Sequence, residues 1–314
     1  MTNKMLLYVI GEGVLFLYKK LNDELKNQFG TKVYKISISS GLSCPNRDGK
    51  CGDRGCIFCG EKGAGEFTSD SRLSISDQIE TAKLRVSKKI KDGKYIAYFQ
   101  SFTNTYGDIE YLRKIFYKAI EKDDIVALSI ATRPDCLGKD VLDLLAEINK
   151  VKPVWVELGL QTIHQKTADH IRRGYPLSIY EKAVKDLKNI GVTVITHMII
   201  GLPNESEKMI IETAKYIGNL TDGIKFHMLY VAKDNDLEKE YKKGNIKLLS
   251  MEEYIYLLSA CIKVLPKSVV VHRITGDPDK KTLIAPMWTA DKKKVLNSIT
   301  KYFKENKIQQ GSNL

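Results

Sequence analysis

The sequence predicts an α/β protein built around a partial (β/α)6 barrel of the TIM type, with extensions at both ends. Stretches with the alternating pattern of strands are separated by stretches with helical periodicity. After the first strand, the strand starts recur roughly every 30 residues, which is the size of one βαβ unit. Strands that alternate with helices form a parallel sheet with helices outside it.

The chain is long enough for one large domain, and its composition is even. Its 314 residues are 43% hydrophobic and 28% charged, and no linker-like segment divides them. We therefore expect a single domain over residues 1–314, with the barrel core at about 32–231 and a C-terminal extension at about 232–314.

Each expected element follows from its residue pattern. Val33, Ile36 and Ile38 mark the first strand, and Ser74 or Ser76 is suited to cap the helix that comes next. The barrel strands are expected at 32–39, 95–100, 125–132, 153–161, 193–201 and 223–231, and the helices at 15–29, 76–91, 109–122, 139–150, 177–190 and 205–219. A tight loop is expected at 63–67, and a helix at 251–265, a late strand at 269–274 and a helix at 290–306 complete the chain.

The N-terminal segment lacks the length and composition of a membrane anchor. Residues 5–18 are apolar, but this stretch is too short to span a bilayer and contains Glu12. It lacks the basic region and cleavage site of a signal peptide, so we expect it to lie on the domain as a helix or strand. Six cysteines without a secretory signal indicate a reducing compartment, so we expect a cytoplasmic protein with no membrane partner.

The chain is basic, with a net charge of +12 and a pI near 9.2. Lysines that merely solvate helix faces would give this charge. A polyanionic partner such as RNA would also explain it. Charge alone does not decide between the two. If RNA binds, the lysines at 280–281 and 292–294 are candidates for phosphate contacts.

Four of the six cysteines lie between Cys44 and Cys59, in a loop rich in Gly, Asp, Asn and Pro. Such a loop has little apolar material to pack, so a bound metal is the expected organiser. Cys56 and Cys59 form a pair two residues apart, while Cys44 and Cys51 stand alone. A closed zinc site with four cysteine ligands is one reading of this pattern. The loop follows the first strand, where the chemistry of such barrels gathers.

Polar residues on strand faces predict a cavity inside the barrel. Glu157, Gly159 and Gln161 share one face of their strand, and Lys225 and His227 share a face of a second strand. On a third strand, His197 shares its face with Ile195, Ile199 and Gly201. Parallel strands covered by helices are usually apolar on both faces. Paired polar residues in the core would explain any one of these strands, but the recurrence favours a cavity that holds a polar ligand.

From about residue 29 to 299 the chain resembles the YhcC/YtqA group of radical S-adenosylmethionine (AdoMet) proteins. This group, also called MnmL-type, is related to the catalytic subunit of Elongator. The resemblance rests on Cys-Pro-Asn-Arg-Asp-Gly from Cys44, on the spacing of Cys56 and Cys59, and on the stretches 98–106, 129–137, 157–162, 201–203, 224–227 and 272–273.

The resemblance implies that Cys44, Cys56 and Cys59 bind a [4Fe–4S] cluster and leave one iron free for AdoMet. The commonest spacing of the superfamily has three residues between the first two cysteines. This chain has a longer spacer, which is the pattern of the YhcC/YtqA branch. Cys51 falls in the spacer and is expected to be dispensable.

By the same resemblance, AdoMet would be held by residues near the strand ends. Phe58 would pack beside the cluster, and Gln161, Arg173 and His197 would approach the ribose and carboxylate. The full expected set for the cofactor is Phe58, Gln100, Ser101, Thr132, Arg133, Glu157, Gln161, Arg173, His197, Ile199 and Gly201, with Ile199 and Gly201 beside the adenine.

The resemblance implies an enzyme that cleaves AdoMet to a 5′-deoxyadenosyl radical, with an electron donor such as flavodoxin or ferredoxin. The expected substrate is tRNA, whose wobble carboxymethylaminomethyluridine would become aminomethyluridine. Lys225 or His227 would act as general acid or base, and Arg273 would anchor an anion. The alternatives are a radical AdoMet enzyme for a small metabolite and a non-catalytic, zinc-stabilised RNA-binding protein.

Overall fold

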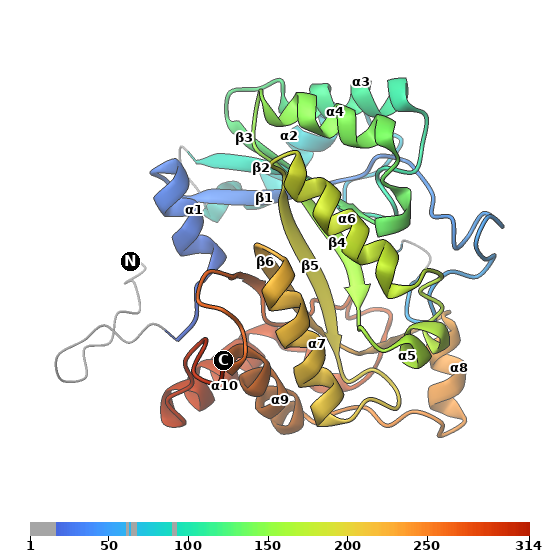
Figure 1. Ribbon diagram of the computed structural model, residues 1–314, viewed down its shortest axis with the longest axis vertical. Helices are drawn as coiled ribbons and strands as arrows, with labels where there is room; N and C mark the ends of the chain where they lie inside the picture. Colours follow the sequence, from blue (N-terminus) through green and yellow to red (C-terminus); the bar gives the residue numbers. More distant parts are fainter. Residues whose placement is uncertain (1–16, 61–62, 64–67, 90–92) are drawn as a thin grey trace.

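The computed structural model describes residues 17–60, 63, 68–89 and 93–314, and its centre is a curled sheet of seven strands (Figure 1). All neighbouring strands are parallel, so their carboxyl ends meet at one edge of the sheet. The strands, in their order across the sheet, are β1 (Val33–Ile38), β2 (Lys94–Phe99), β3 (Ile125–Thr132), β4 (Val154–Gln161), β5 (Thr193–Ile200), β6 (Gly223–Met228) and β8 (Val270–Arg273).

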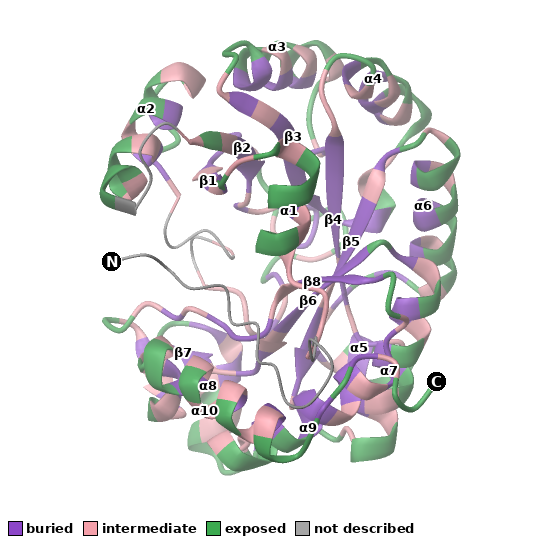
Figure 2. Cartoon of the chain, turned by 90° about the vertical axis from the view of Figure 1, so that its left-hand side faces the viewer, coloured by how far each residue is buried: buried purple, intermediate pink, exposed green. Residues whose placement is uncertain are grey.

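Helices cover the outside of the sheet. Figure 2 shows α2, α3, α4, α6 and α7 around it, with their buried sides toward the strands. The helices are α1 (Leu21–Phe29), α2 (Ile75–Val86), α3 (Ile109–Ile120), α4 (Lys139–Asn149), α5 (Gln165–His170), α6 (Leu177–Asn189), α7 (Glu207–Leu220), α8 (Asp236–Lys242), α9 (Met251–Lys263) and α10 (Lys292–Glu305). None of the helices in the described part of the chain is long and apolar enough to cross a membrane.

Several helices start at residues whose side chains cap them. Ser74 accepts a hydrogen bond from the backbone of Asp77, and Asp108 caps α3 in the same way. Ser250 and Glu253 form a reciprocal capping box at the start of α9. Each such cap stabilises a helix by about 1 kcal/mol, and it fixes where the chain turns from a loop at the strand ends into a helix.

The interior of the barrel is closed at the amino-terminal end of the strands by an apolar layer. One residue from each of β1 to β5 takes part, and Leu25 of α1 packs against them. Figure 2 shows α1 lying across the middle of the curled sheet. The layer consists of Val33, Ile96, Ala127, Trp155 and Ile195. The interior above this layer therefore faces the carboxyl ends of the strands.

The expected α/β half-barrel is confirmed, and the late strand expected at 269–274 forms its seventh strand, β8. Helix α1 begins at Leu21, later than expected, because residues 17–20 are not helical. Residues 5–16, most of the loop expected at 63–67, and the end of the helix expected at 76–91 lie outside the described residues.

Three short features were not predicted. Helices α5 and α8 are too short to show a helical period, and β7 (Val231–Ala232) pairs with β9 (Leu283–Ala285) in a small antiparallel sheet. The strand expected at 223–231 therefore ends at Met228 as β6, and Val231 belongs to the second sheet.

Candidate active site

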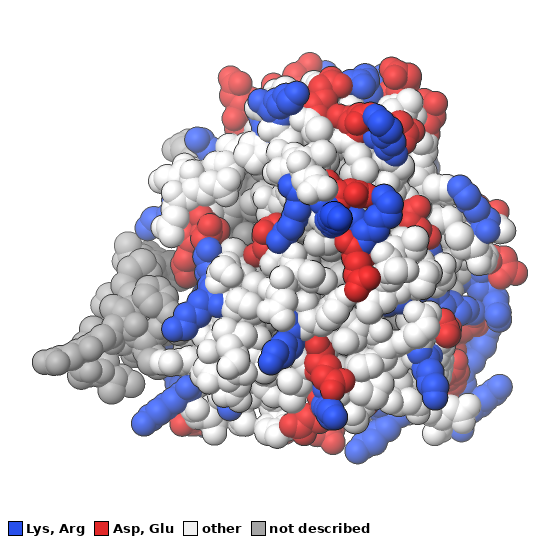
Figure 3. Space-filling model, in the orientation of Figure 1, with Lys and Arg blue, Asp and Glu red and all other residues white. Residues whose placement is uncertain are grey.

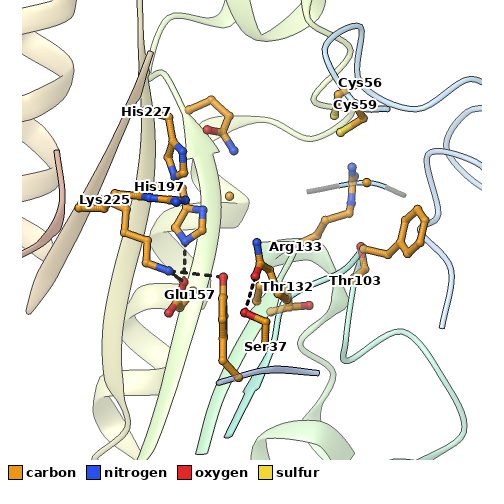
Figure 4. Close-up of a pocket in the computed structure, with 18 of the residues that line it drawn as sticks. Ser37, Cys56, Cys59, Thr103, Thr132, Arg133, Glu157, His197, Lys225 and His227 are labelled. Carbon is orange, nitrogen blue, oxygen red and sulfur yellow. Dashed lines mark hydrogen bonds and ion pairs between the residues drawn. The ribbon is translucent and has the colours of Figure 1, made fainter. Parts of the chain in front are cut away.

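A cavity of about 670 Å³ lies between the interior of the barrel and the cysteine loop, residues 44–59. Each of the seven strands contributes at least one residue to its lining. Figure 4 shows Cys56 and Cys59 on one side of the cavity, with Glu157, His197 and Lys225 on the other. This volume is typical of pockets that enclose a cofactor or a small substrate.

The cysteine loop is held by the two polar side chains of its Cys-Pro-Asn-Arg stretch. Asn46 Nδ2 donates a hydrogen bond to the carbonyl oxygen of Arg172 at 2.7 Å, and the same amide lies 3.6 Å from Sγ of Cys56. Arg47 Nη2 donates to the carbonyl oxygen of Gly60 at 2.6 Å. These bonds give a loop without a core of its own a fixed position.

The backbone of the loop also docks against distant segments. The amide of Ile57 donates to the carbonyl of Ile171, and the amide of Leu237 in α8 donates to the carbonyl of Ile57. Gly174 has a φ of +82°, and a Cβ there would lie 2.8 Å from Oδ1 of Asn46. A glycine is therefore needed for the close approach of the two loops.

Cys44, Cys56 and Cys59 all line the cavity, whereas Cys51 is exposed and does not. Among the residues that the structure describes, no three His, Cys, Asp or Glu side chains are close enough to hold one metal ion. A [4Fe–4S] cluster distributes its thiolate ligands over separate irons, so its ligands must face one space rather than meet at one point. The three cavity-lining cysteines fit that requirement.

The surroundings of Cys56 favour its ligating form. A hydrogen bond from Cys59, together with the charge of Arg133 and the amide of Asn46, lowers the pKa of Cys56 to about 7, although burial opposes this. The thiolate is the form that binds metals. The same hydrogen bond raises the pKa of Cys59, so the electrostatics favour the thiolate at Cys56 and not at its neighbour. It is the donor set of three thiols around one space that suits an iron–sulfur cluster.

Deeper in the cavity, Glu157 is the centre of a polar network. Its Oε1 accepts hydrogen bonds from Lys35 Nζ at 2.5 Å and from Ser129 Oγ at 2.9 Å. Its Oε2 pairs with Lys225 and lies 2.7 Å from Nε2 of His197. The Glu157 side chain is fully buried, so these four partners replace its hydration.

The network sets the protonation states of its members. Burial alone would raise the pKa of Glu157, but Lys225 and Lys35 hold it well below its usual value. Burial lowers the pKa of Lys225 to about 7, against the attraction of Glu157. Burial also lowers the pKa values of His197 and His227. At neutral pH the network therefore contains an ionised carboxylate, neutral imidazoles and a lysine that can exchange its proton.

The structure brings most of the residues expected at the AdoMet site to this cavity. Ser101 is buried with its Oγ 3.1 Å from Oγ1 of Thr68, and Ile199 packs in an apolar cluster, so neither lines it. Gly201 lines a separate cavity of about 460 Å³. The residues that do line the main cavity are Phe58, Gln100, Thr132, Arg133, Glu157, Gln161, Arg173 and His197.

Two of these, Arg133 and Arg173, also hold the chain that surrounds the cavity. Arg173 is 2% exposed, and its Nη1 donates to the carbonyl of Thr162 at 2.6 Å. Arg133 pairs with Asp135 at 2.7 Å and donates to the carbonyl of Arg173 at 2.8 Å. Both guanidinium groups thus fix the segment after β4 while they face the cavity.

Gln161, the last residue of β4, has a strained backbone. Its φ is +70°, and the pairing of β4 with β5 shifts register between Gly159 and Gln161. Left-handed conformations in residues other than glycine cost of order 1–3 kcal/mol and cluster at functional sites. The distortion coincides with the point at which β4 meets the cavity.

Lys225, His227 and Arg273, the expected catalytic residues, also line the cavity. Nε2 of His227 is buried and has no hydrogen-bond partner in the described part of the chain. Nη2 of Arg273 lies 3.8 Å from Oδ2 of Asp277, whereas Nζ of Lys292 lies 2.6 Å from the same oxygen.

Sequence reasoning did not find Lys35, Tyr98, Ser129 and His272 as site residues. Lys35 and Ser37 share one face of β1, and both line the cavity. The argument from polar strand faces, applied to the first strand as well, would have found Lys35. His272 lies in the stretch 272–273 that carries the resemblance, but no role was assigned to it from the sequence; its ring centroid lies 5.5 Å from that of Trp155.

Comparison with known proteins agrees with this geometry. A family model described as the Radical SAM superfamily matches residues 48–217, and one described as the Radical SAM C-terminal domain matches residues 221–305. YtqA of Bacillus subtilis is 43% identical over 295 residues, which are 94% of this chain and 92% of that protein. YhcC of Escherichia coli is 33% identical over 93% of this chain and 94% of its own length.

Two further matches are to archaeal proteins, one in sequence and one in structure. The tRNA uridine(34) acetyltransferase of Methanocaldococcus jannaschii is 30% identical over 156 residues, which are 48% of this chain and 28% of that protein. The structure of Elp3 from Methanocaldococcus infernus, with an N-terminal deletion, superposes with a TM-score of 0.68 at 20% identity, over 88% of this chain and 64% of that one. This second match shows the shared fold.

The family models together span most of the chain, and YtqA and YhcC match over 94% and 93% of it. The half-barrel is the fold that this chain shares with the Elp3 structure. This chain therefore belongs to the radical SAM superfamily of enzymes, which use a [4Fe–4S] cluster and S-adenosylmethionine as cofactors.

Proposed function

We propose that this enzyme modifies the wobble uridine of tRNA, converting its carboxymethylaminomethyl group to an aminomethyl group. The observation that carries the proposal is the similarity of about half the chain to a protein named tRNA uridine(34) acetyltransferase. Residue 34 of tRNA is the wobble position. The matched part is 28% of that relative, so we carry over the nucleoside and not the acetyl transfer.

In this proposal Cys44, Cys56 and Cys59 hold the cluster. Gln161 and Arg173, at the end of β4 and in the loop after it, hold AdoMet together with the cavity-lining Gln100 and Thr132. When bound, the reduced cluster and AdoMet supply a 5′-deoxyadenosyl radical, which removes a hydrogen atom from a substrate carbon. The substrate radical would then lose one electron, which can return to the cluster, to give an imine. Addition of water to this imine would release the two-carbon unit as glyoxylate and leave the aminomethyl group. The residues that line the cavity would position that carbon.

The groups that could move a proton lie on β6. Lys225 has its pKa lowered by burial to about 7, so it can give or accept a proton near neutrality. His227 lines the same cavity, and its buried Nε2 has no hydrogen-bond partner among the described residues. We assign proton transfer to Lys225 or His227, and anion binding to Arg273 at the end of β8.

The RNA would have to be held by the face around the cavity. The net charge of +12 favours a polyanionic partner. On the face in Figure 3, basic and acidic side chains are interspersed and form no single-sign patch. Lys292, at the start of α10, pairs with Asp277 at 2.6 Å, and Asp277 lines the cavity. This contact supports a position near the cavity for Lys292, the first of the three lysines, where RNA would arrive.

An electron donor such as flavodoxin or ferredoxin would reduce the cluster, and a tRNA substrate implies a cytoplasmic reaction. Membership of the superfamily makes the hypothesis of a non-catalytic zinc protein wrong. The remaining alternative, which the experiment must distinguish from this proposal, is a radical AdoMet enzyme whose substrate is a small metabolite.

The test is nucleoside mass spectrometry of tRNA from cells with and without the gene. We expect carboxymethylaminomethyluridine to accumulate and aminomethyluridine to disappear in the deletion strain. A gene copy with Cys56→Ala should fail to restore the wild-type pattern, whereas one with Cys51→Ala should restore it. An unchanged set of wobble nucleosides would contradict the proposal and favour a small-metabolite substrate.

A further inference from the structure

The interior of the barrel contains a polar layer directly above its apolar layer. Each member of the apolar layer on β1 to β5 is followed, two residues later on the same strand face, by a polar residue. The five polar residues are Lys35, Tyr98, Ser129, Glu157 and His197, and Lys225 of β6 completes the layer. Hydrogen bonds and ion pairs connect all six.

The layer has more positive than negative charge. Lys35 and Lys225 share one carboxylate, that of Glu157, and their side chains are 15% and 10% exposed. At the edge of the cavity Arg273 and Lys292 likewise share the single carboxylate of Asp277. Buried charge is costly unless it is paired. When Lys225 is protonated, which its pKa of about 7 allows at and below neutral pH, one cation at the floor of the cavity therefore lacks an anion of its own.

Hydrogen-bonding capacity also remains unused here. Nε2 of His227 and Nδ1 of His272 are buried, and neither has a hydrogen-bond partner among the described residues. Both residues line the cavity. Buried polar atoms in native proteins normally have partners, so unpaired ones that face a cavity point to a ligand.

The layer is separated from the cysteine loop along the barrel axis. Glu157 and Lys225 lie four and three residues before their strands end. At about 3.3 Å per residue, the layer is roughly 10–13 Å below the strand ends. The cysteines lie in the loop beyond the ends. The floor of the cavity is therefore a second subsite, distinct from the place of the cluster.

We infer that this polar layer binds a carboxylate of the substrate, with Lys225 and Lys35 as its cationic partners. One unbalanced positive charge matches a monoanion, whereas a phosphate dianion would overcompensate it. The neutral imidazole of His227 can add a hydrogen bond. The inference rests on the proposed function only for the identity of the ligand, because carboxymethylaminomethyluridine ends in a carboxylate that its product lacks.

The experiment compares each carboxylate with its amide on anaerobic holoenzyme with AdoMet bound. The probes are the nucleoside carboxymethylaminomethyluridine and its primary amide, measured by calorimetry, and acetate and acetamide, measured by ligand-observed NMR. The variants are Lys225→Gln and Glu157→Gln. The matched control is Lys83→Gln, a lysine that pairs with Asp124 at 2.6 Å outside the cavity.

We expect the wild type to prefer the carboxylate over the amide at least tenfold. Lys225→Gln should abolish this preference, because the unbalanced charge is gone. Glu157→Gln should keep or increase it, because an anion has been removed from the same layer. Lys83→Gln should resemble the wild type. If the substitutions merely damaged the fold, both variants would lose the preference for the carboxylate. Opposite changes of this preference in Lys225→Gln and Glu157→Gln therefore identify a binding role.

Three results would overturn the inference. One is equal binding of acid and amide by the wild type. Another is loss of the preference in Glu157→Gln as well as in Lys225→Gln. The third is a loss of AdoMet affinity in Lys225→Gln as large as its loss of carboxylate affinity, which would assign the layer to the cofactor. If acetate shows the expected pattern and the nucleoside does not, the subsite stands and the proposed substrate fails.

Discussion

Glu157 of β4 and His197 of β5 meet inside the barrel, with Oε2 of the carboxylate 2.7 Å from Nε2 of the imidazole. Because the pKa of Glu157 lies well below its usual value, the carboxylate is ionised and accepts the proton that Nε2 carries. The contact gives His197 a role in orienting Glu157, in addition to the AdoMet contact that its place in the sequence suggests. It also places a fixed negative charge among the cations of the cavity floor.

Lys225, on the other side of Glu157, should make stability depend on pH above neutrality. Its pKa is lowered from 10.5 to about 7 in the folded state. Between these values the unfolded chain binds a proton that the folded chain does not, so the free energy of unfolding rises with pH. The rise is at most about 1.4 kcal/mol per pH unit. Below pH 7 both states are protonated, and this contribution is constant and smallest.

The measurement is urea unfolding of wild type and Lys225→Met between pH 6 and pH 10. The stability of the wild type relative to the variant should increase above pH 7. Lys301→Met, which changes an exposed lysine of α10, serves as the control and should give a difference that does not vary with pH. Parallel curves for wild type and Lys225→Met would show that Lys225 titrates normally in the folded protein.

The cluster should depend on three cysteines and not on the fourth. Cys44→Ala, Cys56→Ala and Cys59→Ala should each lose the cluster, because each removes a cavity-lining thiolate. Cys51→Ala should keep it, since Cys51 is exposed and outside the cavity. Iron and sulfide assays with the visible absorption spectrum of anaerobically purified protein measure this. Loss of all iron in Cys51→Ala would contradict the assignment.

Arg173→Ala should weaken AdoMet binding while the iron content stays near that of the wild type. The change removes a guanidinium group that faces the cavity and also the bond to the carbonyl of Thr162. The lost hydrogen bonds leave buried carbonyls unsatisfied, so stability should fall by about 1–3 kcal/mol. Equilibrium dialysis with labelled AdoMet measures the affinity, and Arg72→Ala, on an exposed turn, is the control. An unchanged affinity would remove Arg173 from the cofactor site.

The fold could be predicted from sequence because strand and helix periods are local. The polar layer could be predicted only in part. Glu157 and Lys225 are polar residues on otherwise apolar strands and can be found from the sequence. Lys35 is 122 residues from Glu157, and no local sequence pattern predicts that these two residues form an ion pair. The docking of Asn46 on the carbonyl of Arg172, 126 residues away, is hidden for the same reason. Such contacts depend on the curvature that brings β1 opposite β4.

If tRNA is the substrate, the lysines at the start of α10 should contact phosphates. Each phosphate contact releases condensed counterions, so affinity should fall steeply as salt increases. Changing Lys292, Lys293 and Lys294 together to Gln should reduce the affinity and flatten the slope of its logarithm against log salt. The control changes Lys301, Lys304 and Lys307 at the other end of the helix. An unchanged slope in the first triple would move the contact surface elsewhere on the protein.

The central claim is that this enzyme converts one wobble nucleoside into another, and reconstitution tests it most directly. Holoenzyme with its cluster, AdoMet and a reductant is incubated with tRNA that carries carboxymethylaminomethyluridine, and the nucleosides are then quantified by mass spectrometry. We predict loss of this nucleoside with matching formation of aminomethyluridine, dependent on AdoMet and absent in Cys56→Ala. AdoMet cleavage by the wild type without any change in the tRNA would contradict the account.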